Sequence, residues 1–350
     1  MTDLFDNAAT ESLRLDLRLS HEVIRRLRNR LLKRFLPDFA VLTDFALTAD
    51  VPESHHLKLH CLELSQRYDS QIDGATKLLF RTEAGLPIET VILRIATGRT
   101  TLCLSSQVGC AAACEFCATG HMGIAQNLSA AQILDQVVQV GQLLAAEQRQ
   151  LHNIVLMGMG EPFHNQQNLF EAIECLTDTR QFARSPGSLL VSTVGIPDAM
   201  VRCAQRFPSV NLALSLHSVD QEVRQSIIPL ARKFQLPEIK RAITEINRLQ
   251  KRPVMLEYLM LRGINDSPEQ AQQLAAWVHD INVHINLIPF NPIDDAPHLQ
   301  GSSSEVIRQF SGSLKNAGLK VTTRYSLGTD IAAACGQLVR QVTRPHDKAT

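Results

Sequence analysis

The chain has 350 residues, of which 45% are apolar and 20% charged, and its formal net charge is zero. This is the composition of a globular protein, and the length accommodates one large domain or two ordinary ones. It contains no apolar run of the roughly 18 residues that a membrane span needs, and its N-terminus lacks the pattern of a signal peptide. We therefore expect a cytoplasmic protein without membrane contacts, in which nucleic-acid binding would require a local basic surface.

Eight cysteines occur in this chain. The cytosol keeps thiols reduced, so a disulfide framework is disfavoured in a chain without an export signal. Metal binding or thiol chemistry is the better expectation.

The N-terminal region is rich in basic residues. RLDLRLSHEVIRRLRNRLLKR (residues 14–34) holds eight Arg and Lys side chains against two acidic ones, and Leu19, Val23, Leu27 and Leu31 recur at helical spacing. The pattern predicts one amphipathic helix that ends before Pro37, and its basic face is either simply solvated or a phosphate-contacting patch. A further helix is predicted around residues 55–64, so residues 1–85 are expected to form a mainly helical accessory domain.

From residue 86 to residue 350 we expect the main domain. A strand is predicted at 88–95, followed by six short apolar strands at 101–106, 153–158, 189–193, 211–216, 254–260 and 284–290. Amphipathic helices such as 129–148 and 237–250 lie between them. This alternation indicates an α/β fold with a parallel sheet, open or barrel-like, whose ligands bind at the carboxyl ends of the strands.

The segment after the first of these strands, QVGCAAACEFCATG, places Cys110, Cys114 and Cys117 at C-x₃-C-x₂-C spacing. Three nearby thiolates suit an iron–sulfur cluster, and the lack of a fourth ligand nearby leaves one iron open for a substrate. Alternatively, positions i, i+4 and i+7 share one helix face and could form a small apolar stripe. The glycines Gly109 and Gly120 that bracket the segment favour a loop, and hence the cluster.

The chain resembles the radical S-adenosylmethionine (SAM) superfamily in this motif. Further stretches resemble the dual-specificity 23S rRNA (adenine-2)-methyltransferases and their relative, the chloramphenicol–florfenicol resistance methyltransferase. These stretches are TLCLSSQVGCAAACEFCATG, MGMGEP, STVGIP, LALSLHS, NLIPFNP and DIAAACGQL. The resemblance implies a partial (β/α)6 barrel, a [4Fe–4S] cluster on the three cysteines, and SAM bound to the open iron.

The resemblance also assigns cofactor contacts at the strand ends. It implies SAM binding by Gly160, Glu161, Ser192, Ser215, Leu216, His217 and Asn291. Taken alone, MGMGEP is more typical of a tight turn, and an isolated histidine such as His217 is more typical of a hydrogen-bonded core position.

Three catalytic roles come from the same resemblance. Cys335 is expected to carry a methyl group, Cys103 to release the product by attacking the sulfur of Cys335, and Glu89 to accept the ring proton. Without the resemblance, either thiol would be interpreted as a small buried apolar group. The reaction leaves a disulfide, so we expect an external reductant as well as an electron donor.

The resemblance implies 23S rRNA as the substrate, with tRNA as a second candidate. GMGEP and LIPFNP favour methylation of carbon 2 of adenine, whereas RYSLGTDIAAACGQL is closer to the resistance enzyme, so carbon 8 stays open. Two other functions share part of this pattern. One is a different radical SAM enzyme, such as a protein-radical activase. The other is a non-catalytic RNA-binding protein with a metal site.

Overall fold

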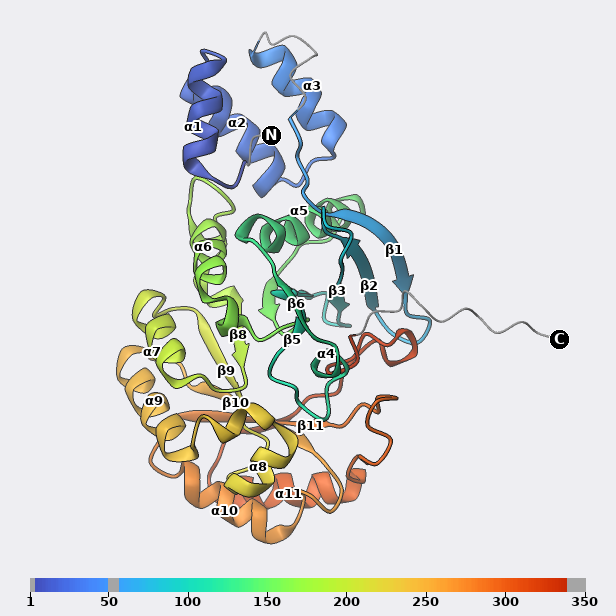
Figure 1. Ribbon diagram of the computed structural model, residues 1–350, viewed down its shortest axis with the longest axis vertical. Helices are drawn as coiled ribbons and strands as arrows, with labels where there is room; N and C mark the ends of the chain where they lie inside the picture. The colour runs from blue at the N-terminus through green and yellow to red at the C-terminus, as the bar shows by residue number, and fades with distance from the viewer. Residues whose placement is uncertain (1–3, 50–56, 339–350) are drawn as a thin grey trace, which may run out of the picture.

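The computed structural model describes residues 4–49 and 57–338 (Figure 1). Its centre is a ten-stranded sheet in the order β1-β2-β3-β4-β7-β8-β9-β10-β11-β12. The first four strands, which are antiparallel neighbours, are β1 (Glu63–Asp69), β2 (Ala75–Arg81), β3 (Pro87–Arg94) and β4 (Thr100–Cys103). From β4 onward the strands run parallel: β7 (Asn153–Leu156), β8 (Leu189–Thr193), β9 (Asn211–Ser215), β10 (Val254–Met260), β11 (Val283–Pro289) and β12 (Val321–Thr323).

The six predicted strand–helix units are confirmed as β4 and β7–β11. Their main helices are α5 (Ala130–Ala146), α6 (Gln166–Thr177), α7 (Pro197–Arg206), α9 (Leu236–Leu249), α10 (Pro268–Val278) and α11 (Ser304–Asn316). Local sequence starts several of them: Ser129 and Gln132 form a capping box on α5, as Ser267 and Gln270 do on α10. This is the expected partial α/β barrel preceded by helices.

Shorter elements fill the loops. β5 (Gln107–Cys110) pairs with β6 (Gly123–Asn127), and α4 (Ala118–His121) lies between them. The remaining short helices are α8 (Gln221–Ile227), η2 (Pro162–Asn165), η3 (Pro186–Ser188), η4 (Pro229–Arg232) and η5 (Thr329–Ile331). None of the helices within 4–49 and 57–338 has the length and apolar character of a membrane-spanning helix.

The N-terminal basic segment is not the single helix that its periodicity predicts. α1 (Asn7–Asp16) ends before Arg18, whose φ of 52° is left-handed, and α2 (His21–Arg28) begins anew with Ser20 as its cap. The π-helical turn η1 (Asn29–Lys33) and α3 (Asp38–Ala49) follow α2. Together these elements form an N-terminal helical layer, which lies above α5 and α6 in the view of Figure 1.

The prediction of a helix around residues 55–64 is wrong for the part of this segment that the structure describes. Residues 50–56 lie outside the described part of the chain, residues 57–62 form no helix, and β1 begins at Glu63. β1 is an exposed edge strand whose partner is β2, and β2 in turn pairs with β3. Residues 63–81 therefore extend the main sheet, and helices account only for the earlier part of the predicted accessory region.

The C-terminal segment after β12 crosses to the opposite edge of the sheet (Figure 1). The Asp330 carboxylate accepts hydrogen bonds from the Ser70 hydroxyl and the Gln71 backbone N–H, both at 2.8 Å. The Gly328 N–H donates to Asp73 at 2.8 Å. The turn between β1 and β2 thus anchors the segment that carries Cys335.

Candidate functional site

The three cysteines of the predicted cluster motif lie in a loop, as expected, and not on one helix face. Cys110 ends β5, and Cys117 stands immediately before α4. Gly109 has a φ of 80°, and a Cβ on it would lie 1.8 Å from the Gly123 carbonyl oxygen, so only glycine fits this approach. All three thiols line one cavity of about 150 Å³.

The donor set of this loop suits an iron–sulfur cluster, because Cys thiolates hold such clusters and all three thiols border the same cavity. A [4Fe–4S] cluster would be held by Cys110, Cys114 and Cys117. Burial raises the pKa of Cys110 to about 12 and that of Cys114 well above its ordinary value, while backbone N–H groups of Ala112 and Glu161 favour the Cys110 thiolate. Positive charge from iron would offset this burial.

Gly160 and Glu161 follow β7 and line the same cavity. Gly160 has a φ of 103°, and a Cβ there would lie 2.6 Å from the Gln107 Cβ. The Glu161 carboxylate accepts from the Phe163 N–H at 3.0 Å and the Val194 N–H at 2.9 Å, and burial raises its pKa to about 7. An ammonium group in the cavity would favour the ionised carboxylate.

His217 is both a hydrogen-bonded histidine and a cavity residue. Its Nδ1 accepts the Leu259 N–H at 3.0 Å, so a neutral ring carries its proton on Nε2. Burial lowers the pKa of His217 to about 3, which keeps the ring neutral. Its ring packs edge-to-face on Phe116 of the cysteine loop, with centroids 4.8 Å apart.

The other predicted SAM contacts differ in their placement. Ser192 and Ser215 line the cavity from β8 and β9. The side chain of Leu216 is fully buried and is not among the lining groups. Asn291 does not line the cavity either; its Nδ2 donates to the Cys335 carbonyl and to the Ser326 hydroxyl, both at 3.0 Å.

Cys335 lies where two cavities meet. It is half-buried and lines both the 150 Å³ cavity and a larger one of about 710 Å³. Its loop is tied to the cluster loop, because the Ala118 N–H donates to the Gly336 carbonyl at 2.8 Å and the Thr119 hydroxyl to the Leu338 carbonyl at 2.6 Å. The structure thus brings Cys335 to the predicted cluster site across more than two hundred residues of sequence.

Cys103 on β4 lines only the larger of the two cavities. Burial, together with the neighbouring Cys335, raises the pKa of Cys103 to about 12, whereas Arg324 opposes the rise. Both thiols line the larger cavity.

Glu89 lies outside the lining of both cavities. Its carboxylate is 3.5 Å from the Lys77 ammonium, and both side chains are almost completely buried. It shares the interior face of β3 with Val91, which does line the larger cavity. Lys77 also donates to the Ala332 carbonyl at 3.3 Å, so this ion pair contacts the Cys335 segment.

Sequence reasoning missed two charged residues of the site, Glu257 and Arg324. Both line the smaller cavity, and Arg324 also lines the larger one. Glu257 stands within an apolar strand, VMLEYLM, where a lone carboxylate is unusual in a parallel sheet. This isolated glutamate was the sequence feature from which a site residue on this strand could have been predicted.

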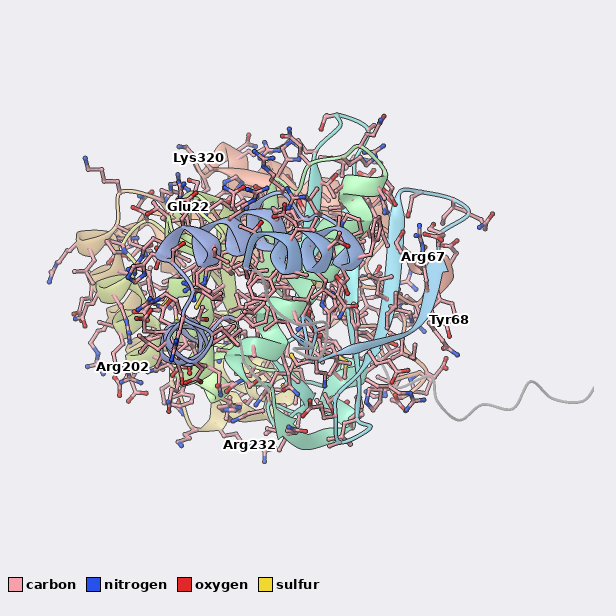
Figure 2. All side chains as sticks on the ribbon, turned by 90° about the horizontal axis from the view of Figure 1, so that it is seen from above. Glu22, Arg67, Tyr68, Arg202, Arg232 and Lys320 are labelled. Atoms are coloured by element: carbon pink, nitrogen blue, oxygen red, sulfur yellow. The ribbon has the colours of Figure 1, made fainter. Side chains whose placement is uncertain are left out.

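The predicted basic surface is largely paired with acidic groups. Arg25 pairs with Glu22 in α2, and Arg26 and Arg30 pair with Asp44 of α3. Arg28 is buried and donates to the Thr10 hydroxyl at 3.0 Å. A cavity of about 340 Å³ remains beside Arg25, Arg26, Arg30 and Arg34. Figure 2 shows this helical layer on the near side of the molecule, with Glu22 on it.

Comparisons with known proteins agree with this geometry. The radical SAM superfamily matches residues 104–275. A probable RNA methyltransferase from Rhodopirellula baltica is 59% identical over 341 residues, covering 97% of this chain and 88% of that protein. A probable dual-specificity RNA methyltransferase RlmN from Thermus thermophilus is 40% identical over 308 residues, covering 88% and 86%.

A solved structure has the same fold. The crystal structure of a radical SAM methyltransferase from Sphaerobacter thermophilus has a TM-score of 0.85 and 34% identity to this chain, and covers 96% of it and 99% of the other. These relatives decide against both a protein-radical activase and a non-catalytic RNA-binding protein. The chain belongs to the RlmN family of radical SAM RNA methyltransferases.

Proposed function

We propose that this enzyme methylates a ring carbon of adenosine in 23S rRNA, with tRNA as a second substrate, and that Cys335 carries the methyl group. The observation that supports this is the position of Cys335 between two cavities: one contains the predicted cluster thiols, and the other contains Cys103. A carrier must receive its methyl group at the cofactor and deliver it to a base, so it has to be accessible from both sides.

The superfamily implies a [4Fe–4S] cluster and SAM. We assign the cluster to Cys110, Cys114 and Cys117, where it would supply one-electron chemistry to bound SAM. For SAM itself we assign Glu161 to the amino group and Gly160, Ser192, Ser215 and His217 to further contacts along the cavity wall. Leu216 and Asn291 would act through the backbone and through the Cys335 loop.

Two covalent steps fall to the chain's own thiols. The Cys335 thiolate accepts a methyl group from SAM, and the Cys103 thiolate later attacks the Cys335 sulfur to free the methylated base. Glu89 is the proposed acceptor of the ring proton, and its carboxylate lies 3.5 Å from the Lys77 ammonium.

The target base has to leave its stack to reach Cys335, as base-modifying enzymes require. We assign the N-terminal helices to RNA phosphates, on the support of the four arginines beside the 340 Å³ cavity.

The proposal is tested by identifying which adenosine carbon is methylated, and in which RNA. Mass spectrometry of nucleosides from RNA of cells with and without this protein should show one adenosine isomer, 2-methyl or 8-methyl, that disappears with the protein. Separate digestion of 23S rRNA and tRNA identifies the substrate. If neither RNA shows a missing methyladenosine, the proposal is wrong.

The cluster has its own test. Anaerobically prepared protein should be brown with about four irons per chain, as a [4Fe–4S] cluster requires. Replacing Cys110, Cys114 or Cys117 by Ala should abolish both the colour and SAM cleavage, whereas Cys175→Ala, outside the loop, should retain them. A colourless, zinc-loaded protein that methylates RNA would contradict the assignment.

A further inference from the structure

Arg224 of α8 is completely buried, although arginine is among the residues that proteins bury least often. Its guanidinium donates to backbone carbonyls that lie just past the carboxyl ends of two neighbouring strands. Nη2 donates to the Val194 carbonyl after β8, and Nε donates to the Leu216 carbonyl after β9 at 3.1 Å. Nη2 also contacts the Ser215 carbonyl at 3.4 Å. One side chain thus joins the loops that follow β8 and β9.

These two loops form part of the wall of the smaller cavity. Val194, Ser215 and His217 line this cavity, whereas Arg224 is not among its lining groups. Val194 is held a second time, because its N–H donates to the Glu161 carboxylate at 2.9 Å. Arg224 and Glu161, the residue assigned to the amino group of SAM, are therefore linked through a single residue.

The peptide group between Leu216 and His217 is fixed at both of its polar ends. Its carbonyl accepts from Arg224, and its N–H donates to the Glu257 carbonyl at 3.3 Å. His217 has a φ of 59°, in the left-handed region that costs a non-glycine residue free energy and persists only where the surroundings hold it. Arg224 thereby contributes to the backbone conformation that places the His217 ring at the cavity.

α8 also contacts the loop of the three cysteines. The Ile227 carbonyl, nearly one helical turn after Arg224, accepts the Glu115 N–H at 3.0 Å. The Ile227 side chain belongs to an apolar cluster that includes Cys110 and Cys114. The helix that carries Arg224 therefore packs against a second wall of the same cavity.

The hydrogen-bonding capacity of arginine explains this residue type. Buried carbonyls past the end of a strand need donors other than the sheet ladder. A guanidinium offers five N–H groups in a rigid fork, so one side chain can hold carbonyls of two loops in a constant geometry. In the described part of the chain its hydrogen-bond partners are neutral carbonyls, so the charge is buried at a cost. Burial lowers the pKa of Arg224 to about 10, which still leaves it protonated at neutral pH.

We propose that Arg224 is a positioning residue for SAM, which joins the loops after β8 and β9 and so places Glu161 and His217 for the cofactor. The inference rests on the proposed function for the binding of SAM at this cavity, but not for the RNA substrate or for the roles of the two catalytic thiols. Loss of Arg224 should weaken SAM binding without removing the cluster.

The experiment measures SAM binding to full-length protein by anaerobic equilibrium dialysis, with the cluster loaded and oxidised and without RNA. SAM carries its label on the carboxyl carbon, so a methyl group passed to a thiol is not counted as bound ligand. Arg224→Gln should weaken binding by about ten- to a hundredfold, the usual effect of removing a group that orients a ligand-contacting residue. Iron content should stay at the wild-type level. Hydrogen–deuterium exchange without SAM should rise in residues 194–196 and 215–218.

Arg184→Gln is the matched control. The Arg184 Nη2 also holds two backbone carbonyls, those of Leu151 and His152, but these precede β7, at the opposite end of that strand from Glu161. This variant should lower the thermal midpoint of unfolding, as Arg224→Gln does, and leave SAM affinity unchanged. Arg224→Lys keeps the charge but lacks the fork, so it should bind SAM several times more weakly than wild type.

Wild-type SAM affinity in a folded Arg224→Gln protein would overturn the proposal, and so would equal weakening in Arg184→Gln. Full affinity in Arg224→Lys would also overturn it, because the charge alone would then suffice; this variant decides the question if Arg224→Gln does not fold or load iron. A wild-type protein that binds no SAM would reject the proposed function itself. Normal binding by both wild type and Arg224→Gln would reject only the role of Arg224.

Discussion

Cys335 and Cys103 both line the larger cavity, but only Cys335 also lines the cavity of the cluster loop. The two proposed roles therefore belong to successive steps: Cys335 accepts the methyl group, and Cys103 acts later, at product release. Cys335→Ala should assemble the cluster, acquire no protein-bound methyl group and yield no methylated RNA. Cys103→Ala should accept the methyl group and stall as a covalent protein–RNA adduct, because release requires a second thiol.

The adduct is measured as a band shift that survives denaturant and disappears on RNase digestion. Cys61→Ala, at a thiol outside both cavities, serves as the control and should turn over normally. If Cys103→Ala turns over like wild type, or if Cys335→Ala forms the adduct, the two roles are assigned wrongly.

At the level of elements, the N-terminal helices present arginines of which only some are available to RNA. Arg25, Arg26 and Arg30 are on the surface side of the layer, whereas Arg28 is buried and belongs to its packing. Replacing the first three by Gln should weaken RNA binding and lower the slope of log affinity against log salt by about one for each phosphate that the variant no longer neutralises. Filter binding at several salt concentrations measures this.

Arg202→Gln is the control for that experiment, because Arg202 is exposed on α7, which lies well below the N-terminal helices in Figure 1. It should leave affinity and slope unchanged. SAM cleavage without RNA should be the same in all variants. An unaltered affinity in the triple variant would mean that this helix face is merely solvated.

His60 links the N-terminal layer to the barrel. Its Nδ1 lies 2.6 Å from Asp135 of α5, and its Nε2 lies 3.0 Å from Asp38 of α3. Although burial favours the neutral ring, the two carboxylates outweigh it and raise the pKa of His60. The contribution of this contact to the free energy of unfolding is therefore complete below the ordinary histidine pKa of about 6.5. It is lost as pH rises through the raised pKa of His60.

His60→Ala should lower the free energy of unfolding by about 1–3 kcal/mol at pH 6, because the buried Asp135 loses a partner. The difference from wild type should shrink as pH rises through the raised value. Urea unfolding at several pH values measures it, with exposed His279→Ala as control. A difference that does not change with pH would show that the contact does not depend on the ionised ring.

At the scale of the whole molecule, the barrel is completed by its C-terminal segment. Asp330 and Gly328 join this segment to the turn between β1 and β2, and Asn291 holds the Cys335 carbonyl. Removing both carboxylates in Asp73→Ala/Asp330→Ala should lower RNA methylation by roughly a hundredfold, because misplacement of a reacting group by about 1 Å has that effect.

Hydrogen–deuterium exchange should rise in residues 325–338 of that variant while iron content is retained. Glu83→Ala, which removes an exposed partner of Lys58, is the control. Normal methylation in the double variant would show that the cluster loop and Asn291 suffice to place Cys335.

The sequence by itself determined the elements of the barrel and the cluster loop. The strand at 254–260 and the helix at 237–250 are found within a residue of their predicted bounds, because periodicity and capping depend on near neighbours. The spacing of Cys110, Cys114 and Cys117 is likewise a local property.

Only the tertiary structure decided which distant groups meet. Residues 14–34 show an unbroken helical period, yet the left-handed turn at Arg18 lets α1 and α2 pack as separate helices. β1 exists through its pairing with β2, a contact that local propensity does not record. Arg324, Glu257 and Cys335 converge because strand register and barrel curvature bring them together, and these depend on packing of the whole chain.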